Sequence, residues 1–263
     1  MDCGSGPQKA PLKPLLRWLG LLAVAAVVLQ LFFVLRIAAM AVLAPESTSF
    51  ERSEAWRVYS QKGRLPWRQQ WVDYPQISDD LKRAVIASED DGFSNHDGVD
   101  WDALEKAWQK NARAEVQAAK TQIIKRPGAT ASSGTAVVRL PKVVGGSTIT
   151  QQLAKNLFLS GERTLLRKGQ EFVLTLILEA LLSKQRILAI YLNSVEWGEG
   201  VFGAEAAAQH YFRKPASRLN AYEAARLAVM LPRPKYFEKT PNSSYLAERA
   251  SVIANRLGGA ELP

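Results

Sequence analysis

The chain is poor in cysteine and histidine, with Cys3 as its only cysteine and two histidines in 263 residues. One cysteine cannot form an internal disulfide, and these counts leave no His/Cys cluster that could hold a metal. There is also no internal repeat and almost no alternation of apolar and polar residues, which argues against a fold built mainly of strands. What the sequence has is positive charge: 34 Lys and Arg against 25 Asp and Glu give +9. This balance predicts an anionic partner, whether nucleic acid, anionic lipid or a phosphorylated substrate.

A long apolar run near the N-terminus predicts a membrane anchor. The run covers Trp18–Leu35, is broken only by Gln30, and resumes as Ile37–Ala44. About 18 apolar residues are enough to span a bilayer. A cleaved signal peptide is the competing interpretation, but the run is longer than the usual apolar core of a signal, and residues 39–41 are a weak cleavage site. We therefore expect a retained transmembrane anchor over residues 18–44.

The charges on either side of this run predict its orientation. Lys9, Lys13 and Arg17 precede it, whereas acidic residues are mixed with arginine after it. By the positive-inside rule, residues 1–17 form a cytoplasmic tail and the rest of the chain lies on the periplasmic side of the cytoplasmic (inner) membrane. Export of the main domain argues against nucleic acid as the partner and favours anions at the membrane.

After the anchor, the sequence predicts a mainly α-helical domain. Residues 45–74 carry three tryptophans among basic residues, and either lie at the lipid headgroups or form the first packed segment of the domain. Helices are expected over residues 78–90, 100–120, 165–182, 183–195, 202–212, 220–231 and 243–257, with another beginning at Thr148. The apolar run Phe172–Leu178 is expected to make its helix the buried central one. Residues 116–142 contain five Lys or Arg and no acid, which predicts an inserted, exposed and mobile basic loop.

The segment Gly145–Asn156, GGSTITQQLAKN, combines two glycines with a helix start. Thr148 and Gln151 have the spacing of a capping box. A glycine turn that leads into the positive end of a helix dipole can hold a phosphate or pyrophosphate, and Gln152 and Lys155 would share the face beside it. By itself, however, a capping box more often marks an ordinary capped helix with a solvated polar face.

Two further segments place carboxylates where they could do chemistry. Glu89 ends an apolar helix and is followed by Phe93, His96 and Gly98. A carboxyl partly buried at such a junction has a raised pKa and is a better base, although a run of solvated acids has the same pattern. Farther along, Arg167-Lys168-x-x-Glu171 sets cations beside a second carboxylate, at a spacing that a surface ion pair worth about 0.3 kcal/mol would also show.

These segments, in this order, resemble the signatures of the peptidoglycan glycosyltransferases (glycosyltransferase family 51), which polymerise lipid II into glycan strands. The matches are EDxxFxxHxG at 89–98, GGSTITQQLAKN at 145–156 and RKxxE at 167–171, with weaker matches at 184–212 and 223–234. Ala189 departs from the family, which often has Glu there. The resemblance implies a lysozyme-like, mainly helical fold. No transpeptidase domain follows, which favours the monofunctional biosynthetic enzymes over the bifunctional penicillin-binding proteins.

The resemblance also implies roles for individual residues. Glu89 would be the catalytic base that takes the proton from the 4-hydroxyl of the acceptor sugar, and Glu171 the second carboxylate, which orients the cations or the donor. The residues implied to bind the substrate and its pyrophosphate are Ser147, Thr148, Gln152, Lys155, Asn156, Arg167 and Lys168. The residues implied to support the site are Asp90, Phe93, His96, Gly98, Gly145 and Gly146. The sequence requires no cofactor and leaves open a divalent cation, Mg²⁺ or Mn²⁺, at the pyrophosphate.

The resemblance therefore implies a single-pass enzyme whose domain, residues 75–263, transfers a growing lipid-linked glycan onto the 4-hydroxyl of lipid II. The anomeric centre inverts and polyprenyl pyrophosphate leaves. Its implied partners are lipid II, lipid-linked glycan, the membrane and proteins of the cell-wall or division machinery. Two alternatives stay open: a lytic transglycosylase that cleaves glycan, since two carboxylates can serve cleavage as well, and a non-catalytic membrane scaffold. The anchor and the cationic group favour synthesis.

Overall fold

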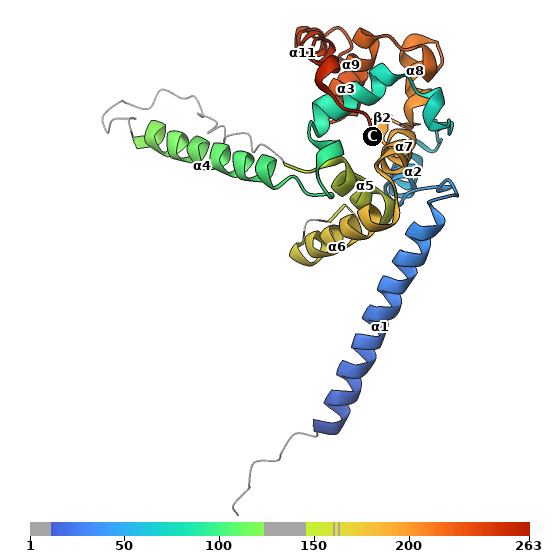
Figure 1. Cartoon of the computed structure of the whole chain (residues 1–263), viewed down its shortest axis with the longest axis vertical. Coiled ribbons are helices and arrows are strands. Elements are labelled where there is room, and N and C mark those ends of the chain that lie inside the picture. The colour runs from blue at the N-terminus through green and yellow to red at the C-terminus, as the bar shows by residue number, and fades with distance from the viewer. Residues whose placement is uncertain (1–11, 124–145, 160, 163) are drawn as a thin grey trace, which may run out of the picture.

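The computed structural model describes residues 12–123, 146–159, 161, 162 and 164–263. One long helix projects from a helical body, and a second projects from its side (Figure 1). The α-helices are α1 (Leu12–Ala39), α2 (Ser49–Lys62), α3 (Asp79–Glu89), α4 (Trp101–Ile123), α5 (Ile149–Phe158), α6 (Leu165–Leu181), α7 (Lys184–Ser194), α8 (Ala204–Phe212), α9 (Ala221–Met230), α10 (Pro234–Lys239) and α11 (Ser244–Ala254). The strands are β1 (Arg68–Gln69), β2 (Glu196–Gly198) and β3 (Val201–Phe202). The expected mainly α-helical fold is confirmed.

The first helix has the length and composition of a membrane span. Its stretch Leu16–Ala39 is 24 residues long and predominantly apolar, and the 18-residue window that is apolar enough to cross a membrane is not buried inside the protein. It nevertheless docks onto the body at its C-terminal end. The rings of Phe33 and Phe158 meet edge to face at 5.3 Å, and Arg186 donates to the carbonyl of Met40 at 2.7 Å. The anchor therefore packs directly against the body instead of hanging from a free linker.

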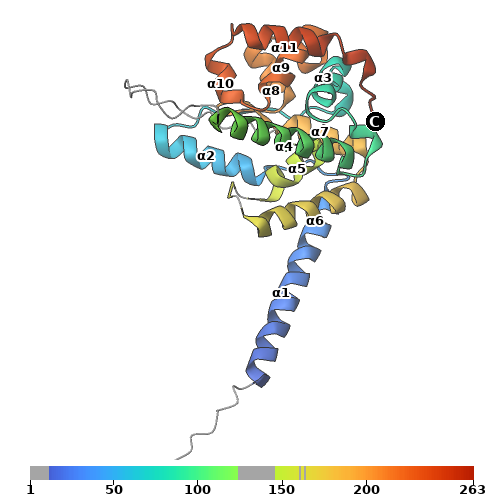
Figure 2. The same cartoon turned by 90° about the vertical axis from the view of Figure 1, so that its left-hand side faces the viewer.

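The core is centred on α7, which is buried from Ile187 to Ser194. On one side α5 packs against α6 and α7, and on the other α3 packs against α9 and α11. We expected α6 to be the central buried helix, and this is wrong: Phe172 and Val173 are each 39% exposed and Leu176 is 45% exposed. Figure 2 shows the reason, because α6 runs across the base of the body where α1 joins it, so the protein covers only one of its faces.

The segment after the anchor is a packed part of the body. In α2, Glu51 and Val58 are buried, and β1 pairs in parallel with β3 in a sheet of order β1-β3-β2. This pairing requires glycine at position 200, where φ is +74° and a Cβ would lie 1.9 Å from the carbonyl oxygen of Pro66. Residues 45–74 therefore contribute a helix and a strand to the domain.

The projecting helix α4 differs from its expected extent. It runs to Ile123, past the expected end at residue 120, so residues 116–123 of the expected loop are helical. The rest of that loop, together with Gly145, lies outside the described residues.

Candidate active site

Two neighbouring cavities meet at the ends of α3 and α5. The larger has a volume of 590 Å³ and lies between α2, α5, α6, β2 and the start of α10. Of the predicted substrate-binding and catalytic residues, it is lined by Ser147, Gln152, Lys155, Asn156, Arg167, Lys168 and Glu171. The smaller has a volume of 390 Å³ and is lined by Glu89, Asp90, Gly146, Ser147 and Thr148, with Lys106 and Lys110 of α4. Residues from separate segments of the chain are therefore brought to one place, and Ser147 borders both cavities.

Glu89 lies at the C-terminal end of α3 and lines the smaller cavity. Its Oε2 accepts a hydrogen bond from Nε2 of Gln152 at 3.0 Å, and Gln152 is itself oriented by the hydroxyl of Tyr191, which donates to Oε1 at 2.9 Å. Burial raises the pKa of the Glu89 carboxyl, and the charge of Asp90 raises it further, whereas Gln152 and Lys155 act in the opposite direction. A carboxyl with a raised pKa and a fixed orientation is suited to accept a proton at near-neutral pH.

Asp90 links the segment 89–98 to the segment 145–156 by hydrogen bonds. Its Oδ2 accepts the backbone N–H of Ile149 at the start of α5, at 2.9 Å, and its Oδ1 lies 2.8 Å from Nε2 of His96. Thr148 caps α5 by accepting from the N–H of Gln151 at 3.2 Å, and its hydroxyl donates to the carbonyl of Gly98 at 2.6 Å. The capping box is confirmed, and these bonds set the N-terminus of α5 beside Glu89.

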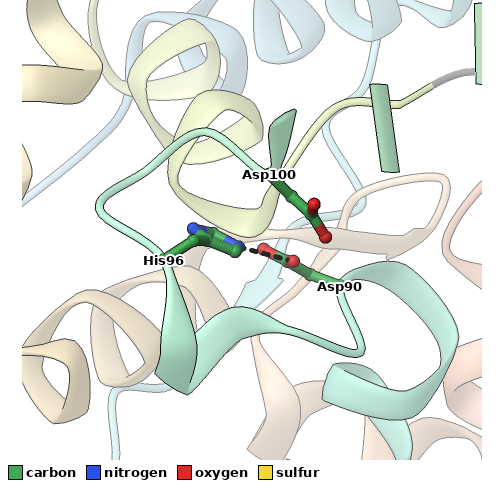
Figure 3. A group of neighbouring side chains, drawn as sticks. All are labelled: Asp90, His96 and Asp100. Atoms are coloured by element: carbon green, nitrogen blue, oxygen red, sulfur yellow. Dashed lines mark hydrogen bonds and ion pairs between the residues drawn. The ribbon is translucent and has the colours of Figure 1, made fainter. Parts of the chain in front are cut away.

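The same region contains a group that could be considered for a metal. Asp90, His96 and Asp100 lie together (Figure 3). Nδ1 of His96 accepts the N–H of Gly98 at 3.2 Å, so Nε2 carries the proton and donates to Asp90. Oδ1 of Asp100 accepts the N–H of Ala103 at 2.7 Å. Because both imidazole nitrogens already have hydrogen-bond partners, these side chains fit a structural hydrogen-bond network better than a metal site.

The larger cavity carries the cationic group. Nη1 of Arg167 lies 3.0 Å from Oε2 of Glu171, and Lys168 pairs with the other oxygen of that buried carboxylate. Burial lowers the pKa of Lys155, and Arg167 and Lys168 lower it further, whereas Glu171 opposes them. Nε of Arg167 is buried and has no hydrogen-bond partner among the described residues. This excess of buried donors and positive charge suits a phosphate-bearing group.

Not every predicted residue faces a cavity, and some residues that do were missed. Phe93 is fully buried in the core, and His96 acts through Asp90. The role of Tyr191 was not predicted, although it lies in the weaker family match at residues 184–212. Only the fold brings its hydroxyl to Gln152. Glu196, which lines the larger cavity, was missed for the same reason. The roles of the predicted site residues in the reaction stay predictions.

Comparison with known proteins gives one consistent result. A family model described as Transglycosylase matches residues 58–123 and 124–258. A protein of Burkholderia thailandensis is 53% identical over 252 residues, covering 94% of this chain and 88% of its own. A protein of Burkholderia vietnamiensis is 47% identical over 268 residues, covering 100% of this chain and 99% of its own. One of Paraburkholderia xenovorans is 48% identical over 251 residues, covering 94% of each chain. All three are named biosynthetic peptidoglycan transglycosylase.

Proposed function

The chain belongs to the transglycosylase family, and on that premise we propose that it is a peptidoglycan glycosyltransferase that polymerises glycan strands from lipid II. It transfers the growing lipid-linked glycan onto the 4-hydroxyl of lipid II, inverts the anomeric centre and releases polyprenyl pyrophosphate. The observation that carries this proposal is the position of Glu89, a carboxyl of raised pKa that lines the smaller cavity and is held by Gln152 of the larger one.

The two cavities suit the two substrates. Glu89 borders the smaller cavity, so the acceptor hydroxyl reaches the base from that side. The larger cavity holds Lys155, Arg167 and Lys168, so the pyrophosphate of the donor binds there. Gln152, which lines the larger cavity and holds Glu89, stands between the two. In this proposal, acceptor and donor bind on opposite sides of one oriented amide.

The chemical step follows from these positions. Glu89 takes the proton of the 4-hydroxyl while that oxygen forms a bond to the anomeric carbon of the donor. The bond from this carbon to the pyrophosphate oxygen breaks, and the leaving group takes the electron pair. The cations of α5 and α6 stabilise its negative charge. A positioned base contributes roughly 10²–10⁴ in rate. No step is assigned to a metal ion, because the carboxylates and the imidazole that could bind one already have partners.

The location of the enzyme is part of the same proposal. The apolar helix Leu16–Ala39 spans the cytoplasmic membrane once, with basic residues before it in the cytoplasm and the body on the outer side. Because α6 lies where α1 enters the body, the cationic group is near the headgroups, where a lipid-linked pyrophosphate would be. Partners among the cell-wall or division proteins fit this location.

The test is incubation of the full-length, detergent-solubilised protein with labelled lipid II, followed by size analysis of the products. Long, muramidase-sensitive glycan from the wild type, and its loss in Glu89→Gln with an unchanged melting temperature, are the expected results. Asp97→Asn is the matched control, because Asp97 is an exposed carboxylate of the same segment and lines neither cavity. Unchanged lipid II together with cleavage of preformed glycan would replace synthesis by the lytic activity.

A further inference from the structure

The larger cavity contains a buried carboxylate whose hydrogen bonding the surrounding protein does not satisfy. Glu196 lies in β2, is 6% exposed and borders the cavity. Its Oε1 is buried without a hydrogen-bond partner among the described residues. Nζ of Lys235 lies 3.3 Å from this oxygen but outside hydrogen-bond geometry, and it makes a closer pair with Glu54. Buried polar atoms are nearly always hydrogen-bonded, so an unpaired one calls for an explanation.

The charged residues that act on Glu196 are different from those of the cationic group of α5 and α6. Burial raises the pKa of Glu196 to about 7, and the charges that act on it come from Lys235, Glu54 and Arg57. None of the cations of α5 or α6 is among them. In Figure 2, α10 lies above α2 and α5, and α6 lies below them, so the cavity reaches from one charged group to the other.

The lining around Glu196 has the character of a saccharide site. Apolar surfaces of Phe50, Val195, Leu231, Pro232 and Pro234 stand beside the Glu54 and Glu196 carboxylates. A sugar ring presents an apolar face of C–H groups and an edge of hydroxyl and amide donors. Binding sites for such molecules combine a mostly apolar wall with a few placed polar groups. A second pyrophosphate would be repelled here by the carboxylates.

We propose that the part of the cavity formed by Phe50, Glu54, Glu196, Pro232 and Pro234, called here the Glu196 subsite, binds a saccharide ring of the lipid-linked glycan. The Glu196 carboxyl accepts a hydrogen bond from a hydroxyl or acetamido N–H of that ring. The proposal rests on the proposed function and adds to it a residue that selects for glycan over bare polyprenyl pyrophosphate. Glu196 is a binding residue and takes no part in the proton transfer.

A purely structural role for Glu196 is the competing explanation, and the ion pairs argue against it. Lys235 keeps Glu54 as its partner when Glu196 is removed, and Glu54 is also paired with Arg57 at 2.9 Å. Removing the Glu196 carboxylate therefore leaves neither Lys235 nor Glu54 without an ion-pair partner. Replacing a poorly paired buried carboxylate with an apolar side chain of similar size is often neutral or stabilising, whereas breaking a well-made buried pair is strongly destabilising. Polar groups that serve binding at the expense of stability are typical of functional sites.

The experiment uses the full-length detergent-solubilised protein and the variants Glu196→Met, Glu196→Gln and, as a matched control, Glu199→Gln. Glu199 follows in the same hairpin but pairs with Lys62 and does not line the cavity. The first probe is a lipid-free peptidoglycan tetrasaccharide, whose dissociation constant is measured by calorimetry without turnover. The second is inorganic pyrophosphate. Steady-state kinetics with lipid-linked tetrasaccharide as donor and the melting temperature complete the set.

We expect Glu196→Met to weaken tetrasaccharide binding about tenfold or more, the loss typical of a hydrogen bond to a charged group. It should raise KM for the lipid-linked tetrasaccharide with little change in kcat, leave pyrophosphate binding unchanged and keep or raise the melting temperature. Glu196→Gln, which can still accept a hydrogen bond, should lose less, and Glu199→Gln should match the wild type.

Two outcomes would overturn the subsite. The first is tetrasaccharide binding within twofold of the wild type in both Glu196 variants, and the second is a fall in melting temperature that accompanies an equal loss of pyrophosphate binding. Failure of the wild type to polymerise lipid II would refute the proposed function instead. The binding measurements would still report on the subsite, because they need no turnover.

Discussion

The contact between α1 and α6 includes a pair of amides that should stabilise the enzyme only in a membrane. Nε2 of Gln30 donates to Oε1 of Gln170 at 3.0 Å, and Nε2 of Gln170 donates back to Oε1 of Gln30 at 3.3 Å. Gln30 lies within the span Leu16–Ala39, on the part of it that packs against α6. The pair therefore lies at the junction of the span and the body, where little water replaces a lost partner.

The size of the effect follows from this position. Hydrogen bonds between transmembrane helices contribute about 0.6 kcal/mol on average and up to about 1.7 kcal/mol. Because Gln30 and Gln170 exchange two such bonds, we expect a coupling free energy of about 1 to 2 kcal/mol. Changing both residues to leucine should cost less than the sum of the two single changes, since each single variant leaves one amide without its partner.

A double-mutant cycle of Gln30→Leu, Gln170→Leu and the double variant measures this coupling from reversible unfolding in bicelles. Val28→Leu, at a lipid-facing position of the same helix, is the control and should show no coupling to Gln170→Leu. Polymerisation by proteoliposomes of each variant shows whether the pair also positions the cationic group of α6. Single effects that add to within about 0.3 kcal/mol would refute the reasoning, because independent sites add to that precision.

Further predictions concern the backbone and the pH profile. Gly200→Ala should destabilise the protein by about 2 kcal/mol or more, because the new Cβ would lie 1.9 Å from the oxygen of Pro66 at a positive φ. Gly63→Ala, also at positive φ but with no atom within 4 Å, should cost about 1 kcal/mol in the same denaturant titration. Because the pKa of Glu89 is raised, kcat/KM should fall on the acid side at a pH above 4.5, where the base becomes protonated. On the alkaline side kcat/KM should fall with a midpoint below pH 10.5, because the lowered pKa of Lys155 makes it lose its charge there. An acid midpoint at or below 4.5 would contradict the assignment of Glu89, and an alkaline midpoint at or above 10.5 would contradict that of Lys155.

The features that were predicted from the sequence are those that depend on local spacing. Thr148 and Gln151 form the expected capping box because both groups lie within one helical turn. Ser78 caps α3 for the same reason. The pairing of Arg167 with Glu171 likewise follows from a spacing of four residues on a helix.

The features that were not predicted depend on partners distant in the sequence. The apolar run in α6 has the composition of a buried helix, but whether protein or membrane covers it is decided by where α1 docks. The same limit applies to Tyr191, whose phenol meets an amide 39 residues earlier. Glu196 was missed because its surroundings come from α2 and α10, which no local pattern connects.

Glu89 and Glu171, the two carboxylates predicted to be catalytic, have different partners and are therefore suited to different roles. Glu171 has an arginine on one carboxylate oxygen and a lysine on the other, so neither oxygen is left to accept a hydroxyl proton. Glu89 accepts only from a neutral amide, and burial raises its pKa. A general base needs a free acceptor oxygen, and of these two carboxylates Glu89 is the one that has it. Glu171 is thereby left to hold Arg167 and Lys168 in the larger cavity, so its loss should weaken binding of the donor pyrophosphate more than it alters the acid limb of the pH profile.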